Sequence, residues 1–591
     1  MYGMNAETLT EMKKRNPMTL GLCLCLITVF NSGLAAGQST GDLQAKVKEF
    51  AAGSEPTLTL PPGRYVLPKE GLVLRKLKGR TIIARGVTLV GTDLDATALQ
   101  FQECVDVAVD GLTLDYDPLP FTQGRLIAVD RTGRTADFQV SAGYPELEPV
   151  YLEGKNVHLF EKDSLRWKNG APDYYPMKIE RLAPDKGRLV FSEHVAGLDQ
   201  LAVGDRVVLN VRKKPGVLVG SGCARVRFIN TTIHSAPGIG ILVRFAEDAG
   251  IYENVRVGPG PRPEGAGEDR LFSTSADAFN AAYARKGPVL RGCDFSFMGD
   301  DAVNLHGVML PVVKWLDDRS FVSMRAHKSE RFDLLIRPGD EVRFLKPPTY
   351  AMAAAGRVEA ISLWDKPDAG VLADIKKIWP TSKGEGEGVF YVIKLKERVA
   401  GVDPGDFCDI PATSAPGFEI RDSAFHDHRA RGLRLMSNDG LVENCRFERL
   451  KGVAISIGPE YAFWREAGWC SDLVIRGNHI TDVGLGTNLR QADNYTTGAI
   501  TIMGRRDPSK EDKSHFQGNA RILVAGNVIE GCSVNGISVS AAREVEITGN
   551  TIRKVNLLDS PKMAADYGLG EQKPISVPHG GAVLRDNMID Q

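Results

Sequence analysis

Residues 521–532 read RILVAGNVIEGC and residues 544–555 read EVEITGNTIRKV. In both stretches two short runs of alternating apolar residues flank a Gly-Asn corner, and Asn527 and Asn550 are 23 residues apart. A period of this length is typical of solenoid repeats, in which each repeat forms one coil and buries its apolar face against its neighbours. We therefore expect Val, Ile and Leu to point inward, and the corner asparagines to stack in a ladder.

The same phrase returns along most of the chain. Further copies are CVDVAVDGLTLDY at 104–116, ARVRFINTTIH at 224–234, PVLRGCDFSF at 288–297, FEIRDSAFHDH at 418–428, GLVENCRFERL at 440–450, DLVIRGNHITDV at 472–483 and AVLRDNMID at 582–590. A β-sandwich would need hairpin turns, but Asn-Gly and Asp-Gly pairs are largely missing at these corners. The predicted fold is all-β, a right-handed parallel β-helix.

Two segments interrupt the repeat, 119–212 and 308–410. They keep a strand-like alternation without the corner phrase, as in GDRVVLNV at 204–211 and GDEVRFL at 339–345. We predict two small β-barrel or sandwich inserts between N-terminal coils at 37–118, middle coils at 213–307 and C-terminal coils at 411–591. Insertions in a solenoid emerge as loops on one side, so these two could wall a binding cleft or only shield an edge.

The N-terminus has the pattern of a secretory signal. Three basic residues at 13–15 precede an apolar run at 18–30 and the small-residue stretch NSGLAAG at 31–37. The apolar run is shorter than the roughly 20 residues that span a bilayer. We therefore expect a signal peptide at 1–36, export to the periplasm or the medium, and no stable membrane insertion. A lipid anchor is disfavoured because Cys23 and Cys25 precede the small-residue site.

Composition excludes several classes of partner and cofactor. Lys and Arg total 73 against 74 Asp and Glu, so no excess charge recruits nucleic acid. The seven cysteines after the signal are scattered and lack C-x-x-C spacing, which argues against a zinc site or a disulfide framework and favours buried packing. We expect no metal and no cofactor. The oligomeric state, a homodimer included, stays open.

Three carboxylates gather in the segment from Ser273 to Gly307. Asp277 and Asp300 are 300 − 277 = 23 residues apart, one coil by the period above, and Asp301 follows directly. A neighbouring carboxylate raises at least one pKa, and one protonated and one ionised acid are what glycoside hydrolysis requires. We predict Asp277, Asp300 and Asp301 as catalytic. The alternative is a carboxylate ladder that binds a cation or caps turns.

Alternating residues beside these acids suggest a substrate-binding face. If Val303 and Leu305 fill the core, Asp300, Asn304 and His306 share the outer face. The loop FWREAGW at 463–469 could present aromatic rings and a carboxylate to a sugar, or could be pinned by buried tryptophans. The predicted substrate-binding residues are Asn304, His306, Arg434, Trp464, Glu466 and Trp469.

The sequence also resembles a known family. S-A-D at 275–277, G-D-D-A-V-N-L-H-G at 299–307, the paired inserts and the signal peptide resemble glycoside hydrolase family 110, the bacterial exo-acting α-1,3-galactosidases that remove terminal galactose from blood-group-B-type glycans. The resemblance implies a β-helix with barrel inserts, inversion, and catalytic acids at Asp277, Asp300 and Asp301. It implies an oligosaccharide or glycoconjugate partner with terminal α-galactose, linear or branched. It does not divide the roles of acid and base.

Three other classes remain as alternatives. Polygalacturonases also combine separated aspartates with G-D-D, but their N-T-D is S-A-D here and their G-H-G and R-I-K are missing. A polysaccharide lyase needs a basic residue and often calcium, and only His426, Asp427 and His428 form such a cluster, which we expect to be solvated. A non-catalytic carbohydrate-binding β-helix would explain the scaffold but not the three acids.

Overall fold

The computed structural model describes residues 40–591 apart from 155, 196, 326–330, 365–369, 371–377, 379–388, 462–463, 486–496, 505–515, 558–571, 580 and 591. The predicted signal peptide lies outside the described residues. Contacts divide the chain into Met1–Ala36 and Gly37–Gln591, and only the second unit is described below. Within the described part of the chain, no helix combines the length and the apolar character that crossing a bilayer requires.

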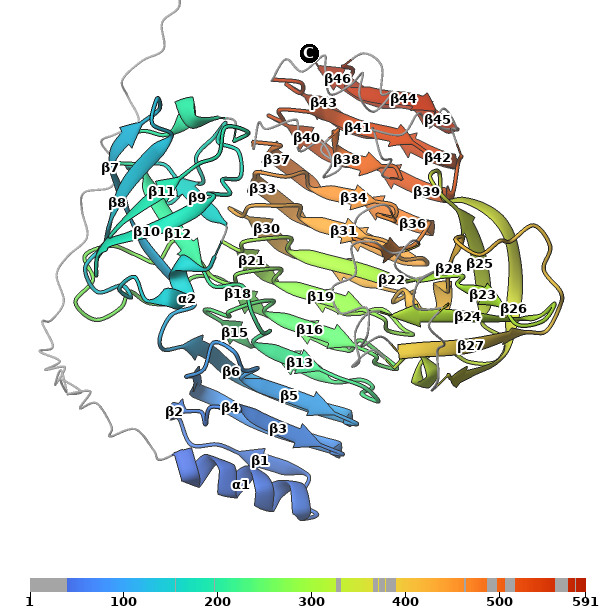
Figure 1. The fold of residues 1–591 in the computed structure, drawn as a ribbon, viewed down its shortest axis with the longest axis horizontal. Coiled ribbons are helices and arrows are strands. Elements are labelled where there is room, and N and C mark those ends of the chain that lie inside the picture. Colours follow the sequence, from blue (N-terminus) through green and yellow to red (C-terminus); the bar gives the residue numbers. More distant parts are fainter. Residues whose placement is uncertain are drawn as a thin grey trace, which may run out of the picture. The chain divides into compact units, whose positions relative to one another are not determined.

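Most strands stack in parallel into a β-helix (Figure 1). One sheet holds two columns of strands that run side by side around a corner. Its strands are β1 Thr57–Thr59, β2 Gly63–Val66, β4 Lys78–Gly91, β6 Val105–Tyr116, β14 Arg227–Ile229, β15 Thr232–Ile233, β17 Ile251–Glu253, β18 Arg256–Val257, β20 Val289–Arg291, β21 Asp294–Ser296, β29 Glu419–Arg421, β30 Ala424–His426, β32 Gly440–Glu443, β33 Arg446–Leu450, β36 Ser471–Arg476, β37 His479–Val483, β39 Asn519–Ala525, β40 Val528–Glu530, β42 Ala542–Thr548, β43 Thr551–Arg553, β45 Ala582–Arg585 and β46 Met588–Asp590.

A third parallel column forms the face that carries the predicted acids. Its strands are β3 Leu72–Arg75, β5 Leu99–Gln102, β13 Val217–Val219, β16 Ile241–Arg244, β19 Phe279–Ala282, β22 Val303–Pro311, β31 Leu433–Leu435, β34 Ile455–Ile457, β38 Gly498–Ile502, β41 Asn535–Ser540 and β44 Ile575–His579. Each strand pairs with the next in this order. The predicted parallel β-helix is confirmed.

Inward and outward residues alternate as the sequence predicts. One hydrophobic core runs through the coils, and it includes Val303, Leu305 and six cysteines. At one corner, Asn478, Asn527 and Asn550 form a buried ladder in which each side-chain amide donates to the next side-chain carbonyl at 2.9 Å. All seven described cysteines are free and buried, which confirms their packing role.

The first insert is an antiparallel sheet with its own core. Its strands are β7 Phe121–Asp130, β8 Thr135–Val140, β9 Val157–Phe160, β10 Lys178–Ala183, β11 Lys186–Val190 and β12 Arg206–Asn210, with the short helices α2 Pro149–Leu152 and η1 Leu198–Gln200. The sheet order is β10-β11-β8-β7-β12-β9. The insert leaves the β-helix after β6 and returns before β13, and it lies to the left of the middle coils, on the side where the third-column strands begin (Figure 1).

The second insert begins at strand β22 of the third column. The outer half of β22 pairs antiparallel with β28, which continues the sheet into the insert. The insert strands are β23 Lys314–Trp315, β24 Ser320–Arg325, β25 Glu341–Lys346, β26 Ala351–Leu363, β27 Val389–Leu395 and β28 Phe407–Asp409, with η2 Phe332–Leu334 and η3 Pro411–Thr413. The short strand β35 Glu466–Ala467 also pairs with β22. This insert lies to the right of the middle coils, on the side where the third-column strands end (Figure 1).

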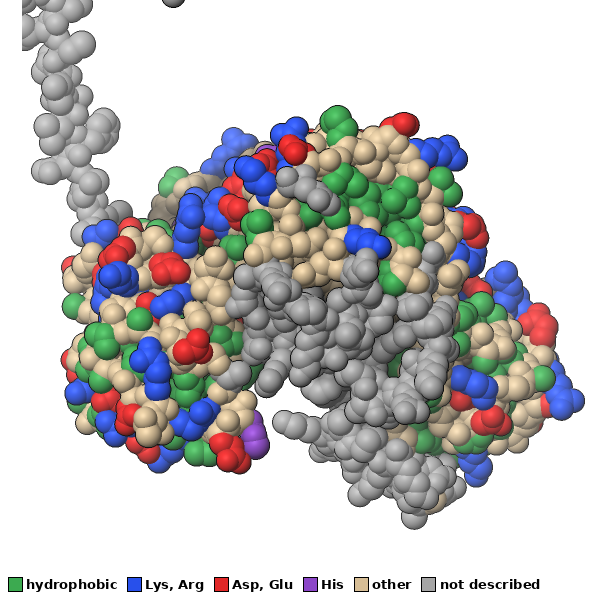
Figure 2. Space-filling model, turned by 90° about the horizontal axis from the view of Figure 1, so that it is seen from above, with side chains coloured by type: hydrophobic (Ala, Val, Ile, Leu, Met, Phe, Trp, Pro, Cys, Tyr) green, Lys and Arg blue, Asp and Glu red, His purple; other side chains and the backbone are tan. Residues whose placement is uncertain are grey.

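The two ends of the stack differ. Helix α1, Thr40–Ala52, covers the first coils and buries Leu43, Val47 and Phe50 against them. The last coil leaves Val583, Leu584, Met588 and Ile589 about half exposed or more. Figure 2 looks onto this end and shows hydrophobic side chains gathered at the surface. The site described next lies between these ends, on the middle rungs.

Candidate active site

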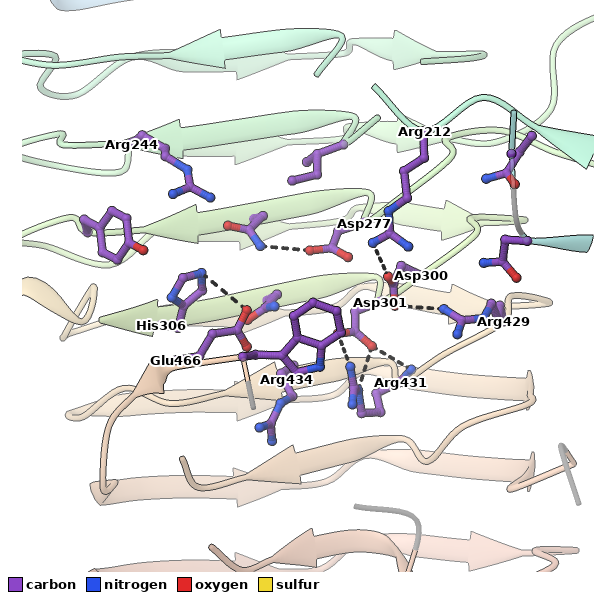
Figure 3. Close-up of a pocket in the computed structure, with 18 of the residues that line it drawn as sticks. Arg212, Arg244, Asp277, Asp300, Asp301, His306, Arg429, Arg431, Arg434 and Glu466 are labelled. Atoms are coloured by element: carbon purple, nitrogen blue, oxygen red, sulfur yellow. Dashed lines mark hydrogen bonds and ion pairs between the residues drawn. The ribbon is translucent and has the colours of Figure 1, made fainter. Parts of the chain in front are cut away.

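A cavity of about 570 Å³ opens on the third column, where β16, β19, β22 and β31 pass between the two inserts. Its floor is formed by outward-facing side chains of these strands, and the first insert contributes Asn156, Tyr175, Asn210 and Arg212. All three predicted acids line it, and Figure 3 shows them with the charged residues around them. One insert therefore walls the cleft, as one of the two readings of the inserts predicted.

Asp277 stands at the corner directly before β19. Phe279 pairs with Val303, so the coil has 24 residues here and Asp277 falls opposite Asp301. The expectation that Asp277 stacks on Asp300 is wrong by one residue, because the 23-residue period comes from C-terminal coils with a shorter corner. The side chain is 6% exposed and accepts a hydrogen bond from Asn280 Nδ2 at 2.8 Å. Burial, with the nearby carboxylates of Asp300 and Asp301, raises the pKa of Asp277 well above its ordinary value.

Asp300 is held ionised by two arginines. Arg212 Nη2 lies 2.5 Å from one carboxylate oxygen and Arg429 Nη1 lies 3.2 Å from the other. Burial acts to raise the pKa of Asp300, but Arg212, Arg429 and Arg431 outweigh it and lower this pKa to about 2. Asp277 and Asp300 are thus adjacent carboxyl groups whose pKa values are shifted in opposite directions.

Asp301 is held by one arginine from the following coil. Its Oδ1 accepts hydrogen bonds from the backbone N–H and the Nε of Arg431 at 2.9 and 2.8 Å, and its Oδ2 accepts from Nη2 at 2.7 Å. The side chain is 1% exposed. This bidentate pairing fixes the orientation of the carboxylate, because the planar guanidinium matches both oxygens at once.

The three acids also have the spacing of a metal site. One oxygen from each lies within 4.8 Å of the others, which is the kind of oxygen cluster that hard cations bind. Both oxygens of Asp300 and of Asp301 are, however, already paired with guanidinium groups. The arginines supply the positive charge that a cation would bring, so the donor set fits a metal poorly.

Several amide oxygens in the cavity lack a partner. Asn210, Asn280 and Asn304 are at most 6% exposed, and the side-chain oxygen of each is buried without a hydrogen bond. A buried acceptor without a donor costs free energy, which a ligand hydroxyl would recover. The floor of the cavity is therefore suited to a hydroxyl-rich ligand, and Asn304 lies where the alternation of β22 predicts it.

The predicted loop places one carboxylate and one tryptophan at the cavity. Glu466 lines it, with Oε1 3.9 Å from His306 Nε2, and Figure 3 shows the two side chains directed toward each other. Burial raises the pKa of Glu466 to about 7, with Arg434 opposing and Glu460 adding to the shift. Trp464 also lines the cavity and is 62% exposed. Phe463, quoted with this loop, lies outside the described residues.

Two of the predicted substrate-binding residues are buried and contact other parts of the protein. Trp469 is 5% exposed and absent from the cavity wall; its indole N–H donates to the carbonyl of Tyr350. The loop is thus pinned by one buried tryptophan and exposes the other. Arg434 lines the cavity but is 1% exposed and donates to Ser456 Oγ and the Gly458 carbonyl. Through these two hydrogen bonds its guanidinium stabilises the floor of the cavity.

The cluster at 426–428 is not solvated as expected. His428 is fully buried, and His426 contacts Asp427 at 2.7 Å and Asp294 at 3.4 Å. Burial opposes protonation of His426, but the two carboxylates outweigh it and raise its pKa to about 9. The expectation is wrong because the corner packs against the first insert, whose Trp167 donates to the Asp427 carbonyl.

The residues that the sequence did not single out are mainly arginines. Arg212, Arg429 and Arg431 contact the acids, and Arg429 also binds Asp173 at 2.5 Å. The one local signal is the pair R-A-R at 429–431, in the corner that follows a repeat phrase. Asn280, Tyr283 and Arg244 complete the lining from β19, its end and β16.

One family model agrees with the fold. The family described as right handed beta helix region matches residues 412–570. Among solved structures, the mannuronan C-5 epimerase AlgE6 A-module of Azotobacter vinelandii aligns with a TM-score of 0.40 and 12% identity, over 93% of this chain and 94% of that chain.

Several proteins similar in sequence are named alpha-1,3-galactosidase A or B. Alpha-1,3-galactosidase B of Bacteroides fragilis strain YCH46 is 27% identical over 52% of this chain and 48% of its own length. The chain thus spans about half the length of the first relatives that it matches. Alpha-1,3-galactosidase B of Phocaeicola vulgatus is 28% identical over 86% of this chain and 88% of its own, and that of Akkermansia muciniphila is 24% identical over 72% and 50%. The chain is a right-handed parallel β-helix protein similar in sequence to α-1,3-galactosidases, which confirms the predicted resemblance.

Proposed function

We propose that this chain is an exported, exo-acting glycoside hydrolase that releases terminal α-1,3-linked galactose from blood-group-B-type or linear α-galactosyl glycans. The observation that carries the proposal is the cluster of Asp277, Asp300 and Asp301 in one cavity, with oxygens within 4.8 Å of one another. The similarity to several α-1,3-galactosidases supports the reaction class and the sugar. Export rests on the N-terminal signal pattern.

Asp277 is the general acid. Its raised pKa favours the protonated form of the carboxyl group, and Asn280 fixes one oxygen. The proton passes from Asp277 to the glycosidic oxygen as the bond to the anomeric carbon breaks, so the departing sugar leaves as a neutral alcohol.

Asp300 and Asp301 supply the negative charge and position the water. Asp300 is ionised with a pKa of about 2, so it stabilises the positive charge that develops on the sugar ring. The water that attacks the anomeric carbon gives its proton to this carboxylate pair. The arginines hold both side chains in place before the reaction, which removes the cost of reorienting them.

The cavity recognises one terminal sugar. Amide oxygens of Asn210, Asn280 and Asn304 accept hydroxyl hydrogens, and the ring of Trp464 offers an apolar surface to C–H groups. Glu466 accepts a further hydroxyl when it is ionised. A volume of about 570 Å³ accommodates such a ligand, within the usual size of small-molecule sites.

The purified protein is expected to release free galactose from α-1,3-linked termini without added metal. The arginines already supply the positive charge at the acids, so incubation with EDTA should leave the rate unchanged. Release is measured by chromatography on defined glycans with α-1,3-, α-1,4- and α-1,6-linked terminal galactose. Loss of activity in EDTA, or an unsaturated product that absorbs in the near ultraviolet, would support a lyase instead.

We expect inversion, so that β-galactose appears first. Inversion generally needs carboxyl groups about 6.5–9.5 Å apart and retention about 5–5.5 Å, and the closest oxygens here lie within 4.8 Å. Inversion is nevertheless expected from the family resemblance. Proton NMR during the first minutes distinguishes the anomers, and α-galactose as the initial product would exclude inversion.

A further inference from the structure

A second depression adjoins the cavity on its N-terminal side. It has a volume of about 970 Å³ and lies along the outer faces of β5, β13 and β16. Leu218 of β13 pairs in register with Gln100 of β5 and with Leu242 of β16. Leu242 pairs in turn with Asn280 in the floor of the catalytic cavity. One continuous row of outward side chains thus runs from Gln100 to the acids, three rungs of about 4.8 Å.

Arg244 joins the two depressions, since it lines both. Its guanidinium lies over the ring of Tyr283 at 5.1 Å, and Tyr283 packs at 5.3 Å against Phe245. Tyr283 lines the cavity and Phe245 lines the groove, so these two rings form the shared wall. Figure 3 shows Arg244 on the side of the cavity opposite Arg431. A ligand that leaves the cavity past Arg244 enters the groove.

The lining of the groove fits a neutral, hydroxyl-bearing chain. Leu218, Leu242 and the 57%-exposed Leu334 of the second insert give apolar contact for the C–H faces of sugar rings. Gln100 and Gln102 add amide groups that donate to and accept from hydroxyls.

The charges of the groove are close to balanced. Four carboxylates and two cations line it; the carboxylates are Glu70, Asp95, Glu103 and Glu247, and the cations are Lys214 and Arg244. Three of the carboxylates are already paired with cations beside the groove, Asp95 with Lys213, Glu103 with Lys76 and Glu247 with Arg337. The lining therefore has no large excess of either charge, which suits a neutral chain.

We propose that this groove is the acceptor site: it binds the neutral oligosaccharide to which the terminal galactose is attached, extended along the helix axis toward the N-terminal coils. The inference rests on the proposed function, because an acceptor site has a role only if a galactosyl bond is cleaved beside Asp277. Contacts to the acceptor are remote from the reacting atoms, and such binding raises kcat/KM for longer substrates.

The test compares three substrates of different acceptor length. They are an aryl α-galactoside, an α-1,3-linked galactose disaccharide, and a neutral tetrasaccharide with the same terminal linkage. For the unaltered protein we expect kcat/KM to rise at least about tenfold from the disaccharide to the tetrasaccharide. Leu218→Glu should abolish this gain, because a hydrated carboxylate replaces an apolar contact, and should leave hydrolysis of the aryl galactoside unchanged.

Leu441→Glu is the matched control, because Leu441 is a half-buried, outward leucine of β32, in the sheet that does not carry the cavity. It should keep the full gain with acceptor length. Equal kcat/KM for disaccharide and tetrasaccharide, or an undiminished gain in Leu218→Glu, would overturn the acceptor site while the proposed hydrolase stands. No galactose release from any of the three substrates would overturn the proposed function and the acceptor site with it.

Discussion

Replacing Asp277 with asparagine is expected to lower kcat on an α-1,3-linked galactose disaccharide by at least about a hundredfold, the lower range of general acid catalysis. The amide has nearly the same shape but carries no acidic proton, so the leaving sugar would depart as an alkoxide. Asp300→Asn and Asp301→Asn should lose at least as much, because each removes negative charge from the transition state. Steady-state kinetics and the melting temperature are measured together, and all three variants should stay folded.

The leaving group separates the roles of these acids. An activated aryl galactoside departs without protonation, so Asp277→Asn should recover most of its rate on that substrate, whereas Asp300→Asn and Asp301→Asn should not. Asp163→Asn is the control, since Asp163 is 83% exposed and outside the cavity. Glu466→Gln should instead raise KM. Unchanged turnover with a raised melting temperature in all three aspartate variants would identify a mere carboxylate ladder.

Arg429→Met is expected to lower the free energy of unfolding by about 3–5 kcal/mol, the scale for removing one partner from a buried ion pair. Arg429 is 11% exposed and contacts Asp173 and Asp300, which are 9% and 16% exposed. Without the guanidinium, two carboxylates remain in a low-dielectric site with less compensating charge. Denaturant unfolding of the variant and the unaltered protein measures the difference.

The pH dependence of this loss has a definite sign. The arginines lower the folded-state pKa of Asp300 to about 2, below its unfolded value of about 3.9. The stabilisation from this pairing is therefore complete above about pH 4 and is lost as the pH falls toward 2. Arg85→Met is the control, because Arg85 is 73% exposed and pairs with Asp110 at the surface. A loss as small as the control's, or one that grows on acidification, would contradict the buried charge pairing.

The coils could be predicted from sequence because their constraints are local. A corner asparagine such as Asn527 must bond its equivalents in the next coils, and the alternating residues around it must fill a narrow core, so both leave a periodic trace. The inserts leave no such trace, since an antiparallel sheet such as β10-β11-β8-β7-β12-β9 is fixed by pairings between distant strands. The bounds of the inserts could be predicted only from the two places where the repeat phrase is missing.

The three proposed catalytic aspartates could be predicted from the sequence, but the arginines that contact them could not. Asp300 and Asp301 are marked by adjacency and by the alternation of β22. Arg212 and Arg429 reach Asp300 across 88 and 129 residues of sequence, and the second of these separations includes the whole second insert. Arginine is common on outer faces of this chain, so no residue type or spacing distinguishes those that point at an acid.

Strand β22 and strand β31 lie on adjacent rungs, with Asn304 paired to Arg434, although the whole second insert separates them in sequence. The rung register is fixed by backbone pairing within the stack, so the insert can change length without displacing the reacting groups. Leu334, in the proposed acceptor groove, belongs to that insert. The insert that lines the proposed acceptor groove can therefore vary among related proteins while the rungs that hold the three acids stay the same.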